Sequence, residues 1–511
     1  MTQAPLRLQV LLAFVLLCAL VLCGGAALAA TSSIELSEYR DGRIFQRNRA
    51  HRARLPIAGR YAGAPRAIEA RVVADRSSAE IVPWTVIDEA PMGGRFRGSL
   101  AKVPQGGWYR LEVRFAGEPS VRRRATARFG VGVLVACAGQ SHIAYWFRDG
   151  PVGPEDEGWA PPAPHRLARM FRHDGFLDEN KRTNDWRPIS GVGATVFANA
   201  LIEALGVPVG LLPYGVGSSA LWQANALTPH PDVRNAPRTY GWWLADGSGR
   251  YPLRDNYAHL RGGLVSVGRE VEALLWVQGE TDAIARDTAA HYAAGLASLF
   301  ARFRFETRRA DLPIFLSLLG RQSKVPWAKV IEDVSAQAIR DAQVWAAERD
   351  PSTHLAATTI DLPLSHDGIH LSRIGQALHA ARMATAVIAT LEGEDETRYR
   401  GPRLDRLDLR DSYVDVWVAH RGGSDFGPPT GIRGFEVFGP AAGRVVGAWR
   451  RDASTIRLAV SGEASSVTAV CYLRGANPGG LDPLLYARRY VHDDSPLALP
   501  LEAGCLTAGD R

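Results

Sequence analysis

Short apolar runs alternate with segments of helical periodicity across residues 130–394, and this alternation constrains the fold more than any other feature. The runs of strand length are 131–138, 207–212, 273–277, 314–318 and 356–360. The segments of helical periodicity are 192–205, 288–305, 330–348 and 372–391. Continuous apolar runs indicate strands buried on both faces, and their alternation with helices is typical of a doubly wound parallel sheet. We therefore predict an α/β domain.

A serine follows the first apolar run. The segment Ala138-Gly139-Gln140-Ser141 places Ser141 beyond the carboxyl end of a predicted strand, where open α/β sheets bind their ligands. A serine hydroxyl becomes a useful nucleophile when a base removes its proton. No serine in the chain lies in a Gly-x-Ser-x-Gly elbow, so the usual α/β-hydrolase arrangement is excluded. The alternative is that Ser141 only caps the next helix.

An acid and a histidine lie three residues apart near the end of the same domain. In Asp367-Gly368-Ile369-His370, a turn that enters a helix can bring the carboxylate and the imidazole to one side. The carboxylate would then orient the imidazole as a base for Ser141. Neighbouring His366 raises a metal-binding alternative, but no second cluster has the spacing of a zinc site. A plain surface turn is the other alternative.

Two further strand ends carry candidate donors for an oxyanion. The amide of Gly217 follows the run 207–212, and Gln278 follows the run 273–277. A glycine allows close backbone approach, and a side-chain amide can meet negative charge without neutralising a base. The alternatives are a strand–helix turn and a buried structural amide. Glu280 is assigned a supporting role, with a helix N-terminal carboxylate as its alternative.

These four blocks together resemble the SGNH hydrolase superfamily, and within it the sialate O-acetylesterase and acetylxylan esterase branch. Gly139-Gln140-Ser141 and Gln278-Gly279-Glu280 carry the variants typical of that branch. The resemblance implies a three-layer α/β/α, flavodoxin-like domain without a metal or organic cofactor. It also implies Ser141 as nucleophile, Asp367 and His370 as its partners, and an oxyanion hole from Gly217, Gln278 and the Ser141 amide.

The chain departs from the branch at two positions, because His142 stands where Asn is usual and Ser218 replaces a second Gly. Both changes concern the shape of the substrate pocket. The candidate substrate-binding residues are Gln140, His142, Trp146, Trp222 and Glu280. Tyr240, Trp242 and Trp243 are either a sugar-stacking platform or simply packed residues.

Short alternating runs separated by Gly and Pro surround the α/β domain. Residues 31–129 are predicted to form a β-sandwich-like domain, similar to the β module of bacterial sialate O-acetylesterases. Residues 395–511 are predicted to form a second β-rich domain, and 130–394 are the catalytic domain. Long segments at 151–184 and 228–256 are predicted to be loops that shape the cleft.

The first 30 residues have the pattern of a signal peptide, in which Arg7 precedes an apolar stretch and small residues end it. Export to the periplasm or the cell exterior is expected, with an uncleaved membrane anchor as the alternative. No later apolar stretch is long enough to span a bilayer, so no stable span is expected after cleavage. Cys471 and Cys505 can pair in an oxidising compartment or remain thiols, while Cys137 is expected to be buried.

The formal net charge of +7 over 511 residues is modest, and charges of both signs are mixed. The run 122–124 of three arginines is typical of a solvated strand end, so no nucleic-acid partner is expected. The predicted activity is serine esterase action on an acetylated glycan or small acetylated sugar through an acetyl-enzyme. The alternatives are a polysaccharide O-acetyltransferase with the same triad and a non-catalytic carbohydrate-binding protein. The sequence does not indicate the oligomeric state.

Overall fold

The computed structural model describes residues 32–173, 184–222, 241–243, 255–284, 286–322 and 332–509. These residues divide into two compact units. The first comprises residues 32–39, 54–103 and 109–128, and the second comprises residues 40–53, 104–108 and 129–509. The predicted signal peptide at 1–30 lies outside the described residues.

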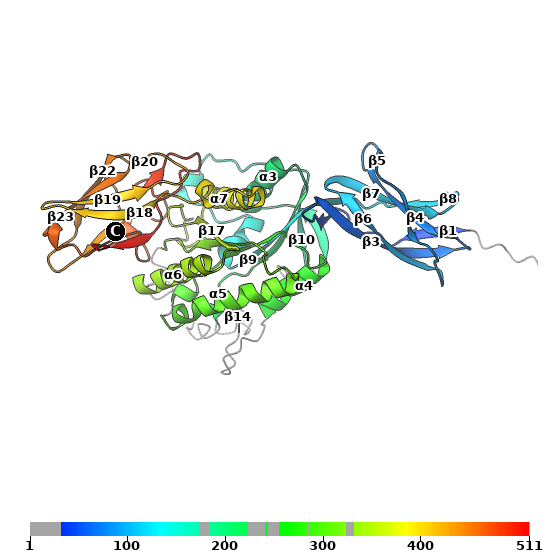
Figure 1. Ribbon diagram of the computed structural model, residues 1–511, viewed down its shortest axis with the longest axis horizontal. Coiled ribbons are helices and arrows are strands. Elements are labelled where there is room, and N and C mark those ends of the chain that lie inside the picture. The colour runs from blue at the N-terminus through cyan, green and yellow to red at the C-terminus, as the bar shows by residue number, and fades with distance from the viewer. Residues whose placement is uncertain are drawn as a thin grey trace, which may run out of the picture. The chain divides into compact units, whose positions relative to one another are not determined.

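The first unit is built from antiparallel strands (Figure 1). One sheet has the order β1-β3-β6, from β1 (Ser33–Leu36), β3 (Arg52–Ala62) and β6 (Arg95–Pro104). In a second group, β4 (Ile68–Ala74) pairs with β5 (Glu80–Asp88) and β7 (Gly106–Phe115), and β7 pairs with β8 (Glu118–Arg124). Buried and outward residues alternate along β3, which is the period of a strand with one face on a core.

A parallel sheet forms the centre of the second unit. Its order is β11-β10-β12-β9-β15-β16-β17, and only β11 runs antiparallel to its neighbour. The strands are β9 (Phe129–Gly139), β10 (Ala168–Arg172), β11 (Asp185–Pro188), β12 (Val209–Gly215), β15 (Ala273–Val277), β16 (Ile314–Leu318) and β17 (Thr353–Thr358). Every residue of β9 is buried, as expected for a central strand covered on both faces.

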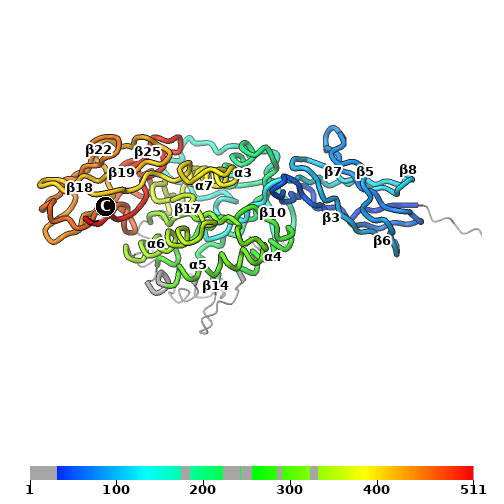
Figure 2. The backbone as a smooth tube through the Cα atoms, in the orientation of Figure 1, coloured from blue at the N-terminus to red at the C-terminus, as the bar shows by residue number. Residues whose placement is uncertain are grey.

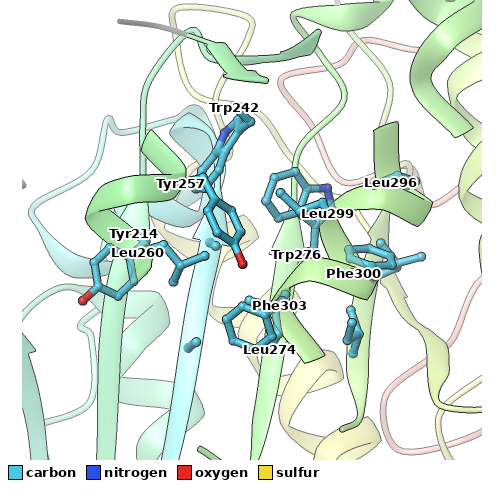
Figure 3. Packing of buried hydrophobic residues seen from close by; sticks show 14 of the residues in the cluster. Tyr214, Trp242, Tyr257, Leu260, Leu274, Trp276, Leu296, Leu299, Phe300 and Phe303 are labelled. Atoms are coloured by element: carbon cyan, nitrogen blue, oxygen red, sulfur yellow. The ribbon is translucent and has the colours of Figure 1, made fainter. Parts of the chain in front are cut away.

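Side chains of β9 alternate between two apolar clusters. Leu134, Ala136 and Ala138 join a cluster with residues of α4 (Asp255–Ser266), α5 (Arg286–Thr307) and α6 (Asp333–Arg349). Figure 3 shows the aromatic part of this cluster, where Trp276 lies near Trp242 and Phe300. Val133, Val135 and Cys137 join the other cluster, with residues of α3 (Val192–Leu205) and α7 (Arg373–Glu392).

Helices α3 and α7 contact each other on one side of the sheet, and α4, α5 and α6 lie on the other side (Figures 1 and 2). The predicted mixed α/β class is therefore confirmed. Among the described residues, no helix combines the length and the apolar character needed to cross a bilayer.

The C-terminal part of the second unit is rich in antiparallel strands. A four-stranded sheet has the order β18-β19-β23-β22, from β18 (Arg403–Leu409), β19 (Val414–Ala419), β23 (Thr455–Val460) and β22 (Val445–Asp452). A three-stranded sheet contains β21 (Phe435–Phe438), β24 (Ala469–Tyr472) and β26 (Gly504–Thr507), and β20 (Phe426–Gly427) pairs with β25 (His492–Asp493). Cys471 and Cys505 face each other in register and form a disulfide, while Cys137 is a buried thiol.

Buried arginines join these strands to the α/β part. Arg340 of α6 donates to the carbonyl of Leu319 at 2.9 Å and to that of Gly475 at 2.7 Å. Arg321, after β16, donates to the carbonyls of Asp482 and Leu485. Each guanidinium is almost fully buried, so its hydrogen-bond partners must come from the protein. Backbone carbonyls of the α/β part and of the C-terminal part supply them.

Helix α3 and strands β15 and β16 have the predicted bounds. The prediction that 151–184 and 228–256 are loops was partly wrong, because β10 lies in the first segment and β14 (Gly241–Trp243) lies in the second. Most of the second segment lies outside the described residues. Strand β10 was missed because two arginines interrupt its five residues. Helix α4 was missed because Gly262 and Gly263 weaken its helical pattern.

Candidate active site

The three central strands end on one line at the carboxyl edge of the sheet. Gly139, the last residue of β9, pairs with Gly215 of β12 and with Val277 of β15. The chain reverses direction across the sheet at β9, because β12 lies on one side of it and the later strands lie on the other. A crevice at such a switch point is where open α/β sheets bind ligands. Ser141, Gly217 and Gln278 all follow these strand ends.

Ser141 is the first residue of the short helix α2 (Ser141–Ala144), and 7% of its surface is exposed. The turn before it requires glycine, because Gly139 has φ +136° and an added Cβ would lie 2.0 Å from the Val277 oxygen. Among the described residues, no hydrogen bond joins the Ser141 hydroxyl to His370. Such bonds are often long in substrate-free enzymes and tighten when substrate binds.

The structure brings Asp367 and His370 together in the loop before α7. His370 Nδ1 lies 2.7 Å from Asp367 Oδ2. The other carboxylate oxygen accepts from the Ser365 hydroxyl at 2.7 Å and from the amides of Ile369 and His370 at 2.9 Å each. Burial raises the pKa of Asp367, but these hydrogen bonds outweigh burial and hold its pKa well below the ordinary value. An ionised Asp367 that accepts from Nδ1–H leaves Nε2 of neutral His370 able to accept a proton.

The ring of His370 lies beside the residues that follow Ser141. Its centroid lies 4.7 Å from that of Tyr145 and 5.8 Å from that of His142, both in edge-on geometry. The guanidinium of Arg148 lies 4.3 Å from the Tyr145 ring centroid. Tyr145 is a site residue that the sequence analysis missed. Its position four residues after Ser141 was an available signal, since residues four apart share a helix face.

Gln278 holds a buried network together instead of facing an open cleft. Its amide nitrogen lies 2.5 Å from Asp282 Oδ2, 3.1 Å from the Ser219 oxygen and 3.2 Å from Gln140 Oε1. An amide has only two N–H groups, and three acceptors already surround this one. The predicted role of the Gln278 side chain as an oxyanion donor therefore does not fit this hydrogen bonding.

Gln140 belongs to the same network. Its Oε1 also lies 3.3 Å from each of the Gly279 and Thr281 amides, and the residue is buried. The predicted contact of Gln140 with substrate is therefore replaced by a contact that joins the ends of β9 and β15.

Gly217 lies in the turn after β12, and an added Cβ would meet nothing within 4 Å. A side chain at this position would therefore meet open space.

His142 and Glu280 form a pair beneath the site. His142 Nδ1 lies 2.5 Å from Glu280 Oε1, and His142 Nε2 lies 3.1 Å from the Ile369 oxygen. Only 5% of His142 and 8% of Glu280 are exposed. Both were named as candidate substrate-binding residues, and Glu280 was also assigned a supporting role. Their burial fits support of the loop that carries His370, which His142 contacts at Ile369, better than contact with substrate.

The prediction that Trp146 forms a pocket wall is wrong. Trp146 is fully buried and packs 5.6 Å from Phe197 and 5.4 Å from His379, between ring centroids. It follows α2 directly and faces α3 and α7 instead of the cleft. Trp242 is also fully buried, so it is packed and cannot stack on a sugar. The side chains of Trp222, Tyr240 and Trp243 lie outside the described part of the chain.

C-terminal residues brace the loop that carries Asp367 and His370. The Leu364 amide donates to the Pro483 oxygen at 2.9 Å. Leu362, Leu364 and Leu371 form an apolar cluster against Leu484 and Tyr486. The position of His370 thus depends on residues more than 100 positions away in the chain.

The described residues contain no group of three or more His, Cys, Asp or Glu side chains that could hold a metal ion. His366 is exposed, and its backbone amide donates to the Val152 oxygen at 2.9 Å. The chemistry offered by these residues is that of a serine nucleophile with an acid–histidine pair.

Residues 166–389 match the protein family described as "Carbohydrate esterase, sialic acid-specific acetylesterase". This stretch contains Gly217, Gln278, Asp367 and His370 but begins after Ser141. The resemblance predicted from the four blocks is therefore confirmed, as is the predicted class of carboxylic ester hydrolase. No curated protein sequence shows significant similarity to the chain.

Among solved structures, a carbohydrate acetylesterase from Xanthomonas citri has a similar fold, with a TM-score of 0.61 and 18% identity. The alignment covers 93% of this chain and 99% of that chain. A protein from Arabidopsis thaliana aligns with 50% of this chain and 98% of its own length, with 18% identity and a TM-score of 0.35. The first of these supports the fold.

Proposed function

We propose that the chain is a serine esterase that removes O-acetyl groups from a carbohydrate, in the manner of sialate O-acetylesterases. Ser141 is the nucleophile, His370 the general base and Asp367 its partner. The observation that carries the proposal is the 2.7 Å contact between His370 Nδ1 and Asp367 Oδ2, beside the segment that bears Ser141. A non-catalytic binding protein has no use for such an arrangement.

The reaction proceeds in two acyl-transfer steps. His370 Nε2 takes the proton of Ser141 as its oxygen attacks the acetyl carbonyl, and the tetrahedral intermediate collapses to an acetyl-enzyme. His370 then returns the proton to the departing sugar alcohol. A water molecule, deprotonated by the same nitrogen, releases acetate and restores Ser141. Asp367 remains ionised throughout and stabilises the imidazolium that forms.

The oxyanion is stabilised by the backbone amides of Ser141 and Gly217. The Ser141 amide is at the first position of α2, where an N–H has no partner within the helix. The Gly217 amide lies in the turn after β12, where an added Cβ would meet nothing within 4 Å. Gln278 acts indirectly, because its hydrogen bonds hold Gln140 and Ser219 beside these turns.

The finer architecture is part of the same proposal. Residues 130–394 form a three-layer α/β/α domain of flavodoxin-like type, flanked by β domains at 31–129 and 395–511. The two apolar clusters on opposite faces of β9 support the layers. The second flanking domain is an integral part of the enzyme, since it braces the loop that carries His370.

We also infer export, with cleavage after the first 30 residues. The Cys471–Cys505 disulfide supports this, because such bonds persist mainly in oxidising compartments. N-terminal sequencing of the protein recovered from periplasm or medium tests the inference, and a first residue close to Thr31 is expected. An intact N-terminus in the membrane fraction would instead indicate an anchor.

The test of the activity uses the 4-nitrophenyl esters of acetate, butyrate and octanoate. We expect hydrolysis that is fastest with acetate and falls by several orders of magnitude in Ser141→Ala, as for other triad members. Ser465→Ala, at an exposed position in the short 3-10 helix Ala464–Ser466, is the matched control and should leave the rate unchanged. Undiminished hydrolysis by Ser141→Ala would exclude the proposed nucleophile.

Acetylated sialic acids, xylan fragments and pectin are the next substrates to compare, with released acetate as the readout. An enzyme that acts on sialate esters should prefer the first of these. Acetyl transfer to an added sugar alcohol in preference to water would identify the transferase alternative, because the same acetyl-enzyme serves both reactions.

A further inference from the structure

His142 contacts two acceptor atoms, one at each ring nitrogen. Nδ1 lies 2.5 Å from a carboxylate oxygen of Glu280, and Nε2 lies 3.1 Å from the carbonyl oxygen of Ile369. A carbonyl oxygen and an ionised carboxylate can only accept hydrogen bonds. A neutral imidazole has one N–H and one lone pair, so it would direct a lone pair at one of these oxygens. The imidazolium satisfies both contacts because it donates twice.

The pair is almost fully removed from water, and its two members favour each other's charge. Burial lowers the pKa of His142, but the charge and hydrogen bond of Glu280 outweigh burial and raise the pKa above its ordinary value. Burial raises the pKa of Glu280, but the charge and hydrogen bond of His142 outweigh it and lower the pKa. Both directions agree with the ion pair that the contacts require.

The other charged and titratable groups around His142 come from the loop before α7 and from α7 itself. Asp367 and His370 belong to the loop before α7, and the His370 ring centroid lies 5.8 Å from that of His142. His379 on α7 is fully buried, and its Nε2 bonds the Ser317 hydroxyl at 2.8 Å. Burial, followed by the charge of His142, lowers the pKa of His379 to about 3, so His379 is neutral and does not compete for Glu280.

We propose that His142 and Glu280 form a buried, permanently charged pair whose imidazolium holds the Ile369 carbonyl and thereby sets the position of His370. The inference rests on the proposed function, in which His370 is the general base. His142 is a positioning residue because it reaches the reaction through the loop it holds. His142 follows Ser141 in the chain, contacts Glu280 in the loop after β15, and contacts Ile369 next to His370. One residue therefore links these three parts of the site.

Two short peptide connections make this link direct. His142 follows Ser141, and Ile369 precedes His370, so the hydrogen bond joins the backbones of the two reacting residues through one side chain. An asparagine at position 142 is shorter and uncharged, and both of its N–H groups lie on one nitrogen, whereas His142 reaches Glu280 and Ile369 from two separate ring nitrogens. Loss of the bond frees the His370 loop, and a misplacement near 1 Å can lower turnover by about 100-fold.

The first experiment measures the charge of His142 without reference to activity. Protein labelled with ¹⁵N in histidine is titrated by NMR from pH 5.5 to 9, and the His142 signals are identified by their absence in His142→Asn. We expect both nitrogens to keep the shifts of an imidazolium at pH 7.5, and in Glu280→Gln we expect a neutral ring. A neutral wild-type ring at pH 7.5 would overturn the proposal.

The second experiment measures kcat and KM for 4-nitrophenyl acetate. In His142→Asn we expect kcat to fall by up to about 100-fold with little change in KM, as for a displaced base. His366→Asn, an exposed histidine of the same loop, is the matched control and should keep the wild-type kcat. Because removal of one partner leaves a buried charge unpaired, His142→Asn/Glu280→Gln is included as a variant without either charge.

The double variant should fold and still have the lowered kcat, since neither charge nor the bond to Ile369 is present. Wild-type kcat in a folded double variant would overturn the positioning role. Failure of the proposed function is a separate result, because it appears as absent hydrolysis in the wild-type protein. The NMR titration still decides the charge of the pair in that case.

Discussion

The carboxylate of Asp361 accepts two hydrogen bonds of 2.8 Å from the guanidinium of Arg382, one to each oxygen. Both side chains are buried, and His492 of β25 adds a contact of 3.1 Å to the same carboxylate. The cluster joins the segment after β17, helix α7 and the C-terminal strands. Arg382 lies on α7, which begins just after His370. The ion pair therefore anchors the helix that follows the loop carrying Asp367 and His370.

Replacement of Asp361 by Asn should destabilise the protein by about 3–5 kcal/mol at neutral pH, because Arg382 is left as a buried charge with one weaker partner. Burial raises the pKa of Asp361, but Arg382 and His492 outweigh it and hold the pKa far below its ordinary value. The stabilising contribution is therefore present above the unfolded pKa of about 3.9 and is lost as pH falls toward the folded value. Urea unfolding of the wild-type protein and of Asp361→Asn at pH 7 and pH 3 measures the difference between their free energies of unfolding. This difference should be smaller at pH 3. An equal difference at both would contradict the ion pair.

Replacement of Asp367 by Asn should lower kcat by about 10⁴-fold with a similar KM, because an amide cannot hold His370 in the required tautomer or stabilise its charge. Steady-state kinetics with 4-nitrophenyl acetate provide the measurement. Asp411→Asn, at an exposed carboxylate among the C-terminal strands, is the control. A loss below tenfold in Asp367→Asn would point to another partner for His370.

Replacement of Trp146 by Ala should cost about 3–5 kcal/mol of stability, because it opens a cavity between α2, α3 and α7. The KM of the remaining folded protein should stay near the wild-type value, since Trp146 is fully buried. Thermal unfolding and kinetics are measured together. Trp345→Ala, where 39% of the side chain is exposed, should be far less damaging. A raised KM with unchanged stability would return Trp146 to the pocket wall.

Replacement of Gln278 by Met keeps the side-chain volume but removes both N–H groups. Asp282 and the Ser219 carbonyl lose a buried donor, so stability should fall by about 1–3 kcal/mol. Loss of a direct oxyanion donor would cost about 10²- to 10³-fold in kcat, and we expect a smaller effect. Gln343→Met is matched, because Gln343 is also buried and bonds the Gln278 carbonyl at 3.0 Å. A 10³-fold loss specific to Gln278→Met would restore the oxyanion role.

Replacement of Cys471 and Cys505 by Ser should lower the free energy of unfolding by about 2–4 kcal/mol, as expected for loss of a cross-link between distant residues. The two cysteines are 34 positions apart and join β24 to β26. Activity at temperatures below the transition should persist, because β24 and β26 belong to a different sheet from β9, the strand that precedes Ser141. Denaturant unfolding with and without reductant is the measurement. Reductant should not change the free energy of unfolding of the double variant. If it did, the effect of reductant would have to come from another cysteine.

The sequence determined those parts of the fold that depend on neighbours in the chain. Strands β15 and β16 were predicted to the residue because each is a short, continuous apolar run, the pattern of a strand covered on both faces. The Asp367–His370 contact was also predictable, since two residues three positions apart with a glycine between them can lie on one turn. Ser141 could be placed at the carboxyl edge because its strand was recognised.

The tertiary structure decided which distant groups meet. His142 and Glu280 are 138 positions apart, and no local pattern indicates that they form a pair. The buried position of Trp146 depends on how α2 turns against α3 and α7, which a four-residue helix does not reveal by its periodicity. For Gln278 the sequence left an oxyanion donor and a buried structural amide as alternatives, and the folded chain placed Asp282, Ser219 and Gln140 around it. Local spacing is fixed by covalent geometry, whereas these contacts depend on the packing of the complete fold.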